Sequence, residues 1–294
     1  MLDWDDLRLF LSVARDGSFI GAGRRLGINH STVSRRLSAL ERAVDARLFD
    51  RSPRGISPTH AGLTLLAHAE RIEAEVLAAT GDVAARDSDV AGTVRLATPE
   101  AFGTFLVAPN IPLLHARHPR LQLELAPETR TVSLSKREAD IAIGFRQPPR
   151  GRLVARRLTD YRLGLYASRE YLERAGPVRD PADLSAHPFV WYIDEYLDAP
   201  ELRFLGQIVS GARTVFRSSS IAAQQAAVAA GVGIGALHLF TAGRDPRLVR
   251  VLAGSVEIQR SYWLILHTDQ QRLPRVRAAI DFLNQVVDQN RDAF

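Results

Sequence analysis

The densest group of charged side chains in the sequence is a run of arginines between residues 24 and 54. Eight arginines stand there against three acidic residues, which leaves a local net charge of +5. The arginines are Arg24, Arg25, Arg35, Arg36, Arg42, Arg47, Arg51 and Arg54. Because the planar guanidinium donates two parallel hydrogen bonds, arginine suits phosphate oxygens and the edge of guanine. These side chains indicate a surface that binds nucleic acid.

Two short helices are predicted to position the arginines. Ser18 can cap a helix over residues 19–26, and Gly27 ends it. Residues 29–31 can cap a second helix, which extends over residues 32–44. Its apolar side chains share one face at helical spacing, namely Val33, Leu37, Leu40 and Val44. Two short helices joined by a tight turn are typical of a helix-turn-helix, whose second helix enters the major groove of DNA.

The segment from Asp50 to Ser57 predicts a tight turn that carries Arg51 and Arg54. Such a turn suits a wing that lies along the phosphate backbone. Periodicity and charge alone leave a second interpretation open, a solvated helical hairpin with ordinary surface arginines.

An ordered series of motifs then follows without gaps. The motifs are Gly17-Ser18-Phe19, Arg24-Arg25-Leu26-Gly27-Ile28, Ser31-Thr32-Val33-Ser34-Arg35-Arg36-Leu37, Leu40-Glu41, Arg47-Leu48-Phe49-Asp50-Arg51 and Thr59-His60-Ala61-Gly62. This series resembles the winged helix-turn-helix of LysR-type transcriptional regulators. It departs from the family at Gly23, where alanine is usual, at His30, where glutamine is common, and at Pro58, where leucine is usual. The helix placement and the resemblance together predict DNA contacts by Asn29, His30, Ser31, Thr32, Ser34, Arg35, Arg36, Arg51 and Arg54.

Two further helices are predicted on either side of this segment. The first covers residues 3–16, and the second extends from residue 58 to about residue 86 with an apolar stripe that has to be buried. The stripe can pack on its own chain. The resemblance implies instead a linker helix that pairs with its twin in a homodimer, or in a homotetramer. The predicted domains are 1–60 for the winged helix-turn-helix and 61–90 for the linker helix.

Residues 91–294 alternate between strand and helix patterns. The order strand, helix, strand, helix, strand between residues 93 and 145 is typical of a parallel sheet with crossover helices. The resemblance implies a two-lobed effector domain like the periplasmic binding proteins, with lobe I at about 91–153 and 266–294 and lobe II at about 154–265. The predicted fold class is therefore an N-terminal all-α winged helix-turn-helix, a long linker helix and an α/β two-lobed effector domain.

Two helix starts in this domain could bind an anionic group. Thr98-Pro99-Glu100 follows one strand, and Ser218-Ser219-Ser220 follows another. Free N–H groups and a partial positive charge attract carboxylates there, although Thr and Ser also cap helices without any ligand. Glu100 opposes an anionic effector unless Arg146 or another cation offsets its charge. The remaining predicted effector contacts are Phe102, Thr131, Leu134 and Phe145.

An enzyme is the main alternative, with residues 218–220 paired to His187 or His238. No Gly-x-Ser-x-Gly motif surrounds these serines, and the histidines lack metal-ligand spacing. The glycines from Gly231 to Gly235 follow a helix and precede a strand, which is the reverse of a dinucleotide-binding motif. We therefore predict no catalytic site, no cofactor and no metal, and the absence of cysteine also excludes a thiolate metal site and a disulfide.

The sequence contains no run of 18 apolar residues, and its first residues lack the features of a signal peptide. These features predict a cytoplasmic protein. The predicted helix-turn-helix and the resemblance predict that it is a regulator whose dimer binds a pseudo-palindromic site in double-stranded DNA. Its other partner is a small-molecule effector, and the resemblance favours a carboxylate. The rival hypothesis is a cleft enzyme or solute-binding protein with an unrelated basic N-terminal hairpin.

Overall fold

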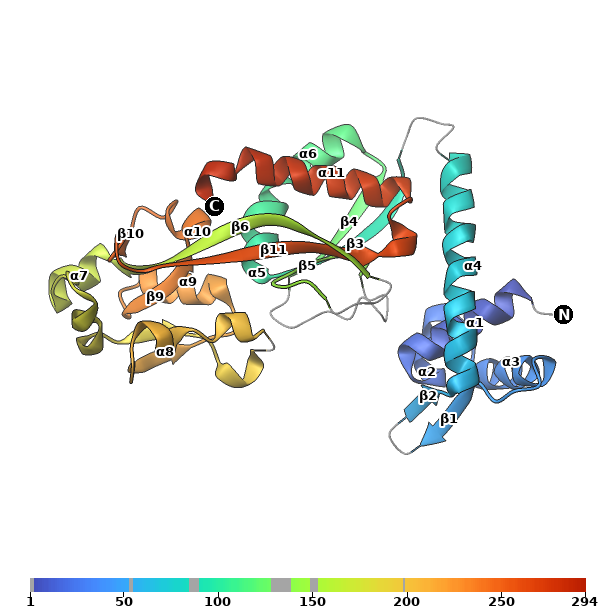
Figure 1. Cartoon of the computed structure of the whole chain (residues 1–294). Coiled ribbons are helices and arrows are strands. Elements are labelled where there is room, and N and C mark those ends of the chain that lie inside the picture. The colour runs from blue at the N-terminus through green and yellow to red at the C-terminus, as the bar shows by residue number, and fades with distance from the viewer. Residues whose placement is uncertain (1–2, 53–54, 85–89, 128–138, 149–152, 198) are drawn as a thin grey trace. The chain divides into compact units, whose positions relative to one another are not determined.

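The computed structural model describes residues 3–52, 55–84, 90–127, 139–148, 153–197 and 199–294. The chain divides into two compact units, the first built on residues 1–88 and the second on nearly all later residues (Figure 1). In the described ranges, every helix is too short or too polar to span a membrane.

Three helices form the body of the first unit: α1 (Trp4–Asp16), α2 (Phe19–Leu26) and α3 (His30–Ala43). Each begins at a residue whose side chain accepts a hydrogen bond from a backbone N–H of the first turn; these caps are Asp3, Ser18 and Asn29. Helices α1 and α2 end at Gly17 and Gly27, whose φ angles of 61° and 67° favour glycine. The bounds of α2 are as predicted, and α3 starts two residues earlier than predicted.

A β-hairpin and a long helix complete the first unit. Strands β1 (Phe49–Ser52) and β2 (Gly55–Pro58) pair antiparallel, so the predicted wing is a two-stranded ribbon. Helix α4 (His60–Ala84) follows directly. At Gly62 the helix lies so close to the backbone carbonyl of Leu48 that a side chain would overlap it.

A single apolar cluster holds the three helices, the hairpin and the start of α4 together. It consists of Leu7, Leu9, Phe10, Leu11, Val13, Ala22, Val33, Leu37, Leu40, Leu48, Phe49 and Ala69. The three residues from α3 are those whose spacing predicted its inner face. Their burial fixes which face of α3 remains exposed.

The second unit is built on one mixed sheet of nine strands, counted over the described residues. Its order is β4-β3-β5-β11-β6-β9-β7-β8, with β10 beside β6. The strands are β3 (Gly92–Thr98), β4 (Leu121–Pro127), β5 (Ile141–Gly144), β6 (Leu153–Ser168), β7 (Phe189–Trp191), β8 (Thr214–Arg217), β9 (Ile234–His238), β10 (Leu248–Val251) and β11 (Glu257–His267).

Each side of this sheet is parallel, as the alternating pattern predicted for the strands between residues 93 and 145. Strand β3 pairs parallel with β4 and β5, and β7 pairs parallel with β8 and β9. We call β3–β5 with their helices lobe I, and β7–β10 with theirs lobe II. Strands β6 and β11 lie between the two sets and pair antiparallel with each other.

Strand β6 is longer than predicted. The alternation of apolar residues in the sequence predicts two strands here, 154–158 and 161–166, but the structure has one strand that covers both. No glycine or proline stands between them to end the strand. The strand continues through a β-bulge instead. Tyr262 of β11 pairs with Thr159 and Trp263 pairs with Arg157, so Leu158 is the extra residue in β6.

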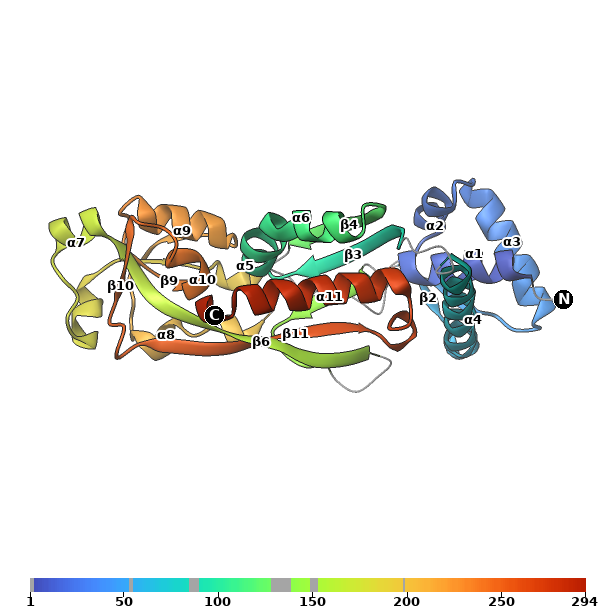
Figure 2. The same cartoon turned by 90° about the horizontal axis from the view of Figure 1, so that it is seen from above.

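Helices cover the strands of both lobes. Residues 100–117 are helical throughout, as α5 (Glu100–Phe102), a π-helical turn η1 (Gly103–Val107) and α6 (Ala108–Arg117). The other helices are α7 (Arg169–Ala175), η3 (Pro181–Ala186), η4 (Asp194–Tyr196), η5 (Pro200–Leu202), α8 (Leu205–Ile208), α9 (Ile221–Ala229), α10 (Leu239–Ala242), η6 (Thr268–Gln270), α11 (Pro274–Gln289) and η7 (Arg291–Ala293). From above, α11 extends along lobe I on the same side as α6 (Figure 2). The second helix that the sequence pattern predicts between residues 93 and 145, at 132–138, lies outside the described residues.

Candidate nucleic-acid interface and effector region

The outer face of α3 is polar and accessible. His30, Ser31 and Arg35 are exposed, whereas Thr32 and Ser34 are half-buried. Asn29 is also exposed, but its side chain caps the helix by accepting a hydrogen bond from Ser31 N at 3.1 Å. The opposite face is formed by Val33, Leu37 and Leu40, none more than 2% exposed. The helix therefore presents its predicted contact residues outward from a rigid apolar base.

Arg35 and Arg36 have different surroundings. Arg36 donates from Nε and Nη2 to Asp6 Oδ1 at 2.9 and 2.6 Å, which ties α3 to α1. Within the described parts of the chain, the Arg35 guanidinium forms no hydrogen bond or ion pair, and the residue is exposed. A guanidinium without an internal acceptor can bond to DNA without first losing a protein contact. The Arg35 side chain is therefore available for DNA, whereas the Arg36 side chain is already bound to Asp6.

Polar contacts hold the hairpin against the end of α3. Glu41 Oε1 accepts from the backbone N–H groups of Leu48 and Phe49 at 2.8 and 3.3 Å. Thr59 Oγ1 donates to Arg47 O at 2.6 Å, which joins the residues before and after the hairpin at its open end. Glu41 and Thr59, which belong to the sequence motifs noted above, therefore hold the hairpin in place, a role that their spacing did not predict.

Of the two arginines predicted on the wing, only one has a described backbone. Arg51 lies in β1, paired opposite Ile56. Arg54 lies outside the described residues, as do Thr131 and Leu134 of the predicted effector contacts.

An ion pair between α1 and α4 is the most buried in the first unit's described residues. Arg15 donates to both carboxylate oxygens of Glu73, at 3.1 and 2.6 Å, and the two side chains are 11% and 16% exposed. Burial lowers the pKa of Arg15, while Glu70 and Asp16 counteract this shift. The pair fixes the direction of α4 relative to the three-helix body.

In the second unit, the predicted effector residues gather at the carboxyl end of β3. Thr98 is 3% exposed, and its hydroxyl has no hydrogen-bond partner in the described ranges. Pro99 takes the N-cap position of α5, so Thr98 does not cap this helix. Thr98 packs instead against the backbone of Gly103, where no side chain would fit. It remains a buried hydroxyl in need of a partner.

Glu100 reaches across to the predicted serine segment. Its Oε1 accepts from the Ser220 hydroxyl at 2.7 Å, and its Oε2 accepts from the backbone N–H of Ile221 at 2.5 Å. Ser218 stabilises this turn by accepting from Ser220 N at 3.1 Å. The structure therefore brings together the two predicted helix starts, with the Glu100 carboxylate between them. Ser219 is half-buried beside this contact.

An aromatic cluster lies behind these helix starts and includes two residues predicted as apolar contacts. Phe102 and Phe145 lie 5.1 and 6.1 Å from Tyr262, measured between ring centroids, and Tyr161 stacks on Tyr262 at 4.1 Å. The Tyr161 and Tyr262 hydroxyls are buried and lack a partner within the described residues. Arg146, after Phe145, is exposed.

Burial dominates the electrostatics of this cluster. It raises the pKa of Tyr161, Tyr192 and Tyr262, and the charge of Glu100 contributes to the shift at Tyr192. All three phenols are therefore neutral and can donate hydrogen bonds. Sequence reasoning missed these tyrosines, although Tyr161 and Tyr262 stand on β6 and β11, the strands that lie between the two lobes.

The residues of the enzymatic alternative do not come together as a catalytic site. His187 Nδ1 is hydrogen-bonded to the Tyr171 hydroxyl at 2.6 Å. His238 stacks on Tyr161, and burial lowers the pKa of its imidazole to about 3. Ser220 is engaged with Glu100. Both histidines are core residues of lobe II.

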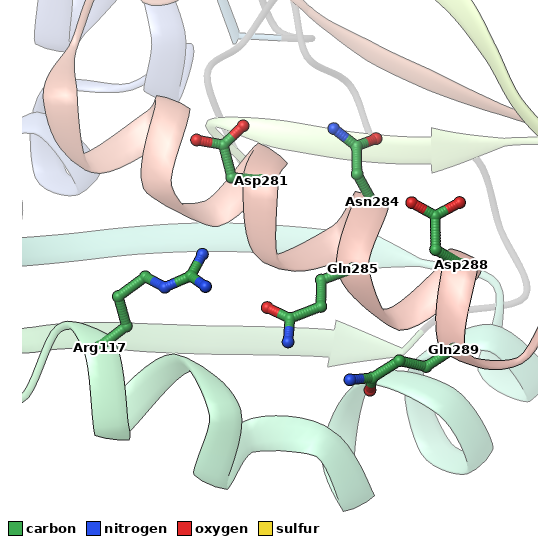
Figure 3. A pocket seen from close by; sticks show the side chains of 6 residues that line it. All are labelled: Arg117, Asp281, Asn284, Gln285, Asp288 and Gln289. Carbon is green, nitrogen blue, oxygen red and sulfur yellow. The ribbon is translucent and has the colours of Figure 1, made fainter.

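The described residues of the second unit line two surface hollows. A cavity of 430 Å³ is lined by Phe105 of η1, Gln225 of α9 and the segment from Phe240 to Arg247. The other, of 470 Å³, lies between α6 and α11, where Arg117 projects toward the polar side chains Asp281, Asn284, Gln285, Asp288 and Gln289 (Figure 3). Neither contains a residue that was predicted as an effector contact.

Two family models together match nearly the whole chain. Residues 4–63 match the "bacterial regulatory helix-turn-helix protein, lysR family", and residues 87–288 match the "LysR substrate binding domain". The first match covers the three helices and the hairpin of the first unit, and the second covers the sheet of the second unit together with Glu100 and the serine segment.

Relatives and solved structures agree with these matches. The chain is 30% identical to a probable HTH-type transcriptional regulator, LtrA, of Klebsiella pneumoniae, over 96% of this chain and 94% of that protein. It is also 30% identical to an HTH-type transcriptional regulator of Xanthomonas campestris, over 96% and 84%. The structure of CrgA from Neisseria meningitidis shares 25% identity over 97% and 99% of the two chains, with a TM-score of 0.61. A full-length OxyR variant from Pseudomonas aeruginosa shares the fold, with a TM-score of 0.71 at 20% identity over 98% and 95%.

Proposed function

The chain belongs to the LysR family of bacterial transcriptional regulators, and we propose that two copies of it bind one pseudo-palindromic operator. It is a DNA-binding regulator rather than an enzyme, and a small-molecule effector bound by its second unit modulates it. Its site of action is the cytoplasm, where bacterial DNA lies.

Helix α3 enters the major groove in this proposal, and the hairpin β1–β2 lies along the phosphate backbone. Arg35 reaches a base edge or phosphate from the exposed face of α3. Arg36, held by Asp6, orients α3 rather than binding DNA directly. Asn29, His30, Ser31, Thr32 and Ser34 complete the contact face, and Arg51 and Arg54 supply phosphate contacts from the wing.

A homodimer is supported by apolar side chains that the chain leaves exposed on α4. Ile72 and Val76, four residues apart and therefore on one face of the helix, are 44% and 39% exposed, whereas Leu63, 55% exposed, lies on the opposite face. A partner helix along the face of Ile72 and Val76 would remove this apolar area from water. A dimer with twofold symmetry would place two copies of α3 on two half-sites of inverted sequence. Two such dimers would form a tetramer.

We place the effector-binding region around Thr98. It joins the ends of β3 and β5, the serine segment and the aromatic cluster, and its proposed contacts are Thr98, Pro99, Glu100, Phe102, Thr131, Leu134, Phe145, Arg146, Ser218, Ser219 and Ser220. Buried hydroxyls without partners support it, because a polar ligand group would satisfy them. The aromatic rings suit an apolar body of the ligand.

The observation that carries the proposal is the polar, accessible face of α3 on a fixed apolar base. The experiment is selection of bound fragments from random DNA by the full-length chain, followed by footprinting on the enriched sequence. We expect an inverted repeat that protects two half-sites. Recovery of no preferred sequence would overturn the proposal.

A variant pair tests the effector region separately. Thr98→Val keeps the shape of the side chain and removes the hydroxyl, so a ligand oxygen would lose a donor, at a cost of about 1–3 kcal/mol. With a small molecule that shifts operator binding, we expect Thr98→Val to raise the concentration needed, while operator affinity without ligand stays unchanged. Ser219→Ala is its counterpart on lobe II. Unaltered midpoints in both variants would place the effector site elsewhere.

A further inference from the structure

The Glu100 carboxylate occupies the N-terminus of a helix in the other lobe. Its two oxygens accept separately from the Ser220 hydroxyl at 2.7 Å and from Ile221 N–H at 2.5 Å. Ser220 is the N-cap of α9, and Ile221 is its first residue. Glu100 is the first residue of α5, in lobe I. A single carboxylate therefore links the starts of two helices that are 120 residues apart in sequence.

The start of α9 is suited to an acid group. Its first turn contains no acidic residue of its own. The N-terminal N–H groups of a helix lack intrahelical partners and carry a partial positive charge, which favours an anion. Glu100 supplies this anion from outside the helix, and both its hydrogen bonds are charge-assisted.

The Thr98 hydroxyl is a second, independent sign of a ligand position. Thr98 stands two residues before Glu100 and is 3% exposed. Its side-chain hydroxyl has no hydrogen-bond partner in the described part of the chain. A buried hydroxyl of this kind is normally satisfied by protein, water or ligand. The structure thus combines an occupied acid position with a buried, unsatisfied hydroxyl two residues before the carboxylate in the chain, where it packs against Gly103.

We propose that Glu100 is an internal ligand that holds the carboxylate position at the start of α9 until a small carboxylate effector displaces it. The inference rests on the proposed effector region and adds its regulation. One carboxylate fills the two donors, so Glu100 and the carboxylate of the effector exclude each other. The carboxylate of the effector accepts hydrogen bonds from the Ser220 hydroxyl and the Ile221 N–H in place of Glu100. Another polar atom of the effector forms a hydrogen bond with the Thr98 hydroxyl. Release of Glu100 removes the link between α5 and α9.

This exchange connects ligand binding to the geometry of the lobes. While Glu100 is bound, α5 of lobe I is fixed to α9 of lobe II. Once an effector replaces it, the carboxylate that contacts α9 is no longer part of lobe I. The two states therefore differ in a lobe-to-lobe contact, which is the differential interaction that coupling between two sites requires.

Chemical rescue of Glu100→Ala by acetate tests whether the position accepts a free carboxylate. The melting temperature of the full-length chain is measured in sodium acetate and in sodium chloride of equal ionic strength. We expect a lowered melting temperature in Glu100→Ala that acetate partly restores, with no acetate-specific shift in the wild type. Glu173→Ala, an exposed carboxylate on α7, is the control and should show neither effect. Equal behaviour of Glu100→Ala in the two salts would refute the proposal.

Glu100→Gln keeps the size of the side chain and removes its charge, so it serves even where Glu100→Ala does not fold. We expect faster amide hydrogen exchange over residues 219–223 and unchanged exchange in α11. We also expect operator affinity without ligand to change by at least about 5-fold, the lower end of typical coupling. A purely structural cap would leave operator affinity at the wild-type value, and that result would overturn the regulatory part.

The two proposals fail in different ways. Acetate rescue is measured without DNA, so its absence would leave the operator experiments untouched. Conversely, a chain that selects no DNA sequence would overturn the proposed function, while rescue of Glu100→Ala would still identify the acid position at α9.

Discussion

Replacing Glu73 by glutamine removes one charge from the buried pair that joins α1 and α4. The wild-type pair is bidentate, with N–O distances of 3.1 and 2.6 Å, and both side chains are less than one-fifth exposed. In Glu73→Gln, one amide oxygen can still accept a hydrogen bond, but Arg15 loses the counter-charge that faces it. The Arg15 Nε is already buried without a partner among the described residues, so it gains nothing in compensation.

The expected cost follows from the burial of the charge that remains. Breaking a buried ion pair by removing one partner typically costs about 3–5 kcal/mol. Glu70 and Asp16 still act on Arg15 and counteract the effect of burial on its pKa. We therefore expect about 2–3 kcal/mol for Glu73→Gln, below the usual range for an isolated pair. Removing both charges with Arg15→Met and Glu73→Leu should recover most of this loss, because no buried charge is then left unpaired.

Amide hydrogen exchange of α1, followed by mass spectrometry of the full-length chain, measures the effect locally. We expect the free energy of opening of α1 to fall by about 2–3 kcal/mol in Glu73→Gln. Hydrogen exchange in β6 and β11 should stay unchanged. Glu75→Gln, an exposed carboxylate on the same helix, should alter exchange by less than about 0.5 kcal/mol. Wild-type exchange of α1 in Glu73→Gln, or a double variant no better than the single one, would refute this view of the pair.

Two other predictions concern DNA binding and assembly. Arg35→Ala should cost about 1–3 kcal/mol of operator affinity without loss of stability, whereas Arg36→Ala and Asp6→Ala should each lower stability by about 0.2–1 kcal/mol and weaken DNA binding less. Equal losses of affinity in Arg35→Ala and Arg36→Ala, measured by fluorescence anisotropy, would contradict the separation of their roles. Ile72→Asp should place a charge in the proposed helix pair, so dimer and operator affinity should fall together in sedimentation and anisotropy. A wild-type chain that sediments as a monomer at micromolar concentration would disprove the pairing.

Local rules predicted the first unit well because its elements are short and each has its own start and stop signals. Ser18 and Gly27 bound α2 as expected, and the burial of Val33, Leu37 and Leu40 follows their spacing. The spacing did not reveal that Arg36 is held by Asp6. That contact joins residues thirty positions apart, and helical periodicity carries no information about such a distance.

In the second unit, the sequence predicted the type of sheet but not the groups that meet across it. The alternating pattern correctly predicted parallel strands in lobe I, while strand β6 was divided in two because a bulge interrupts its pattern. Glu100 was predicted as an effector contact that opposes an anion, without any partner of its own. Its bonds to Ser220 and Ile221 depend on the tertiary fold, since they join two helices that no local signal relates.

Sequence-specific DNA binding by the full-length chain is the central claim. Its most direct test is the ratio of affinities for the selected operator and for a scrambled duplex of equal length and composition, at about 150 mM salt. We expect a ratio of at least about 10³, typical of specific regulators, and a sharp reduction of this ratio in Arg35→Ala. Equal affinity for both duplexes, with the same dependence on salt concentration, would mean that the arginines bind only phosphate charge, and it would contradict the account.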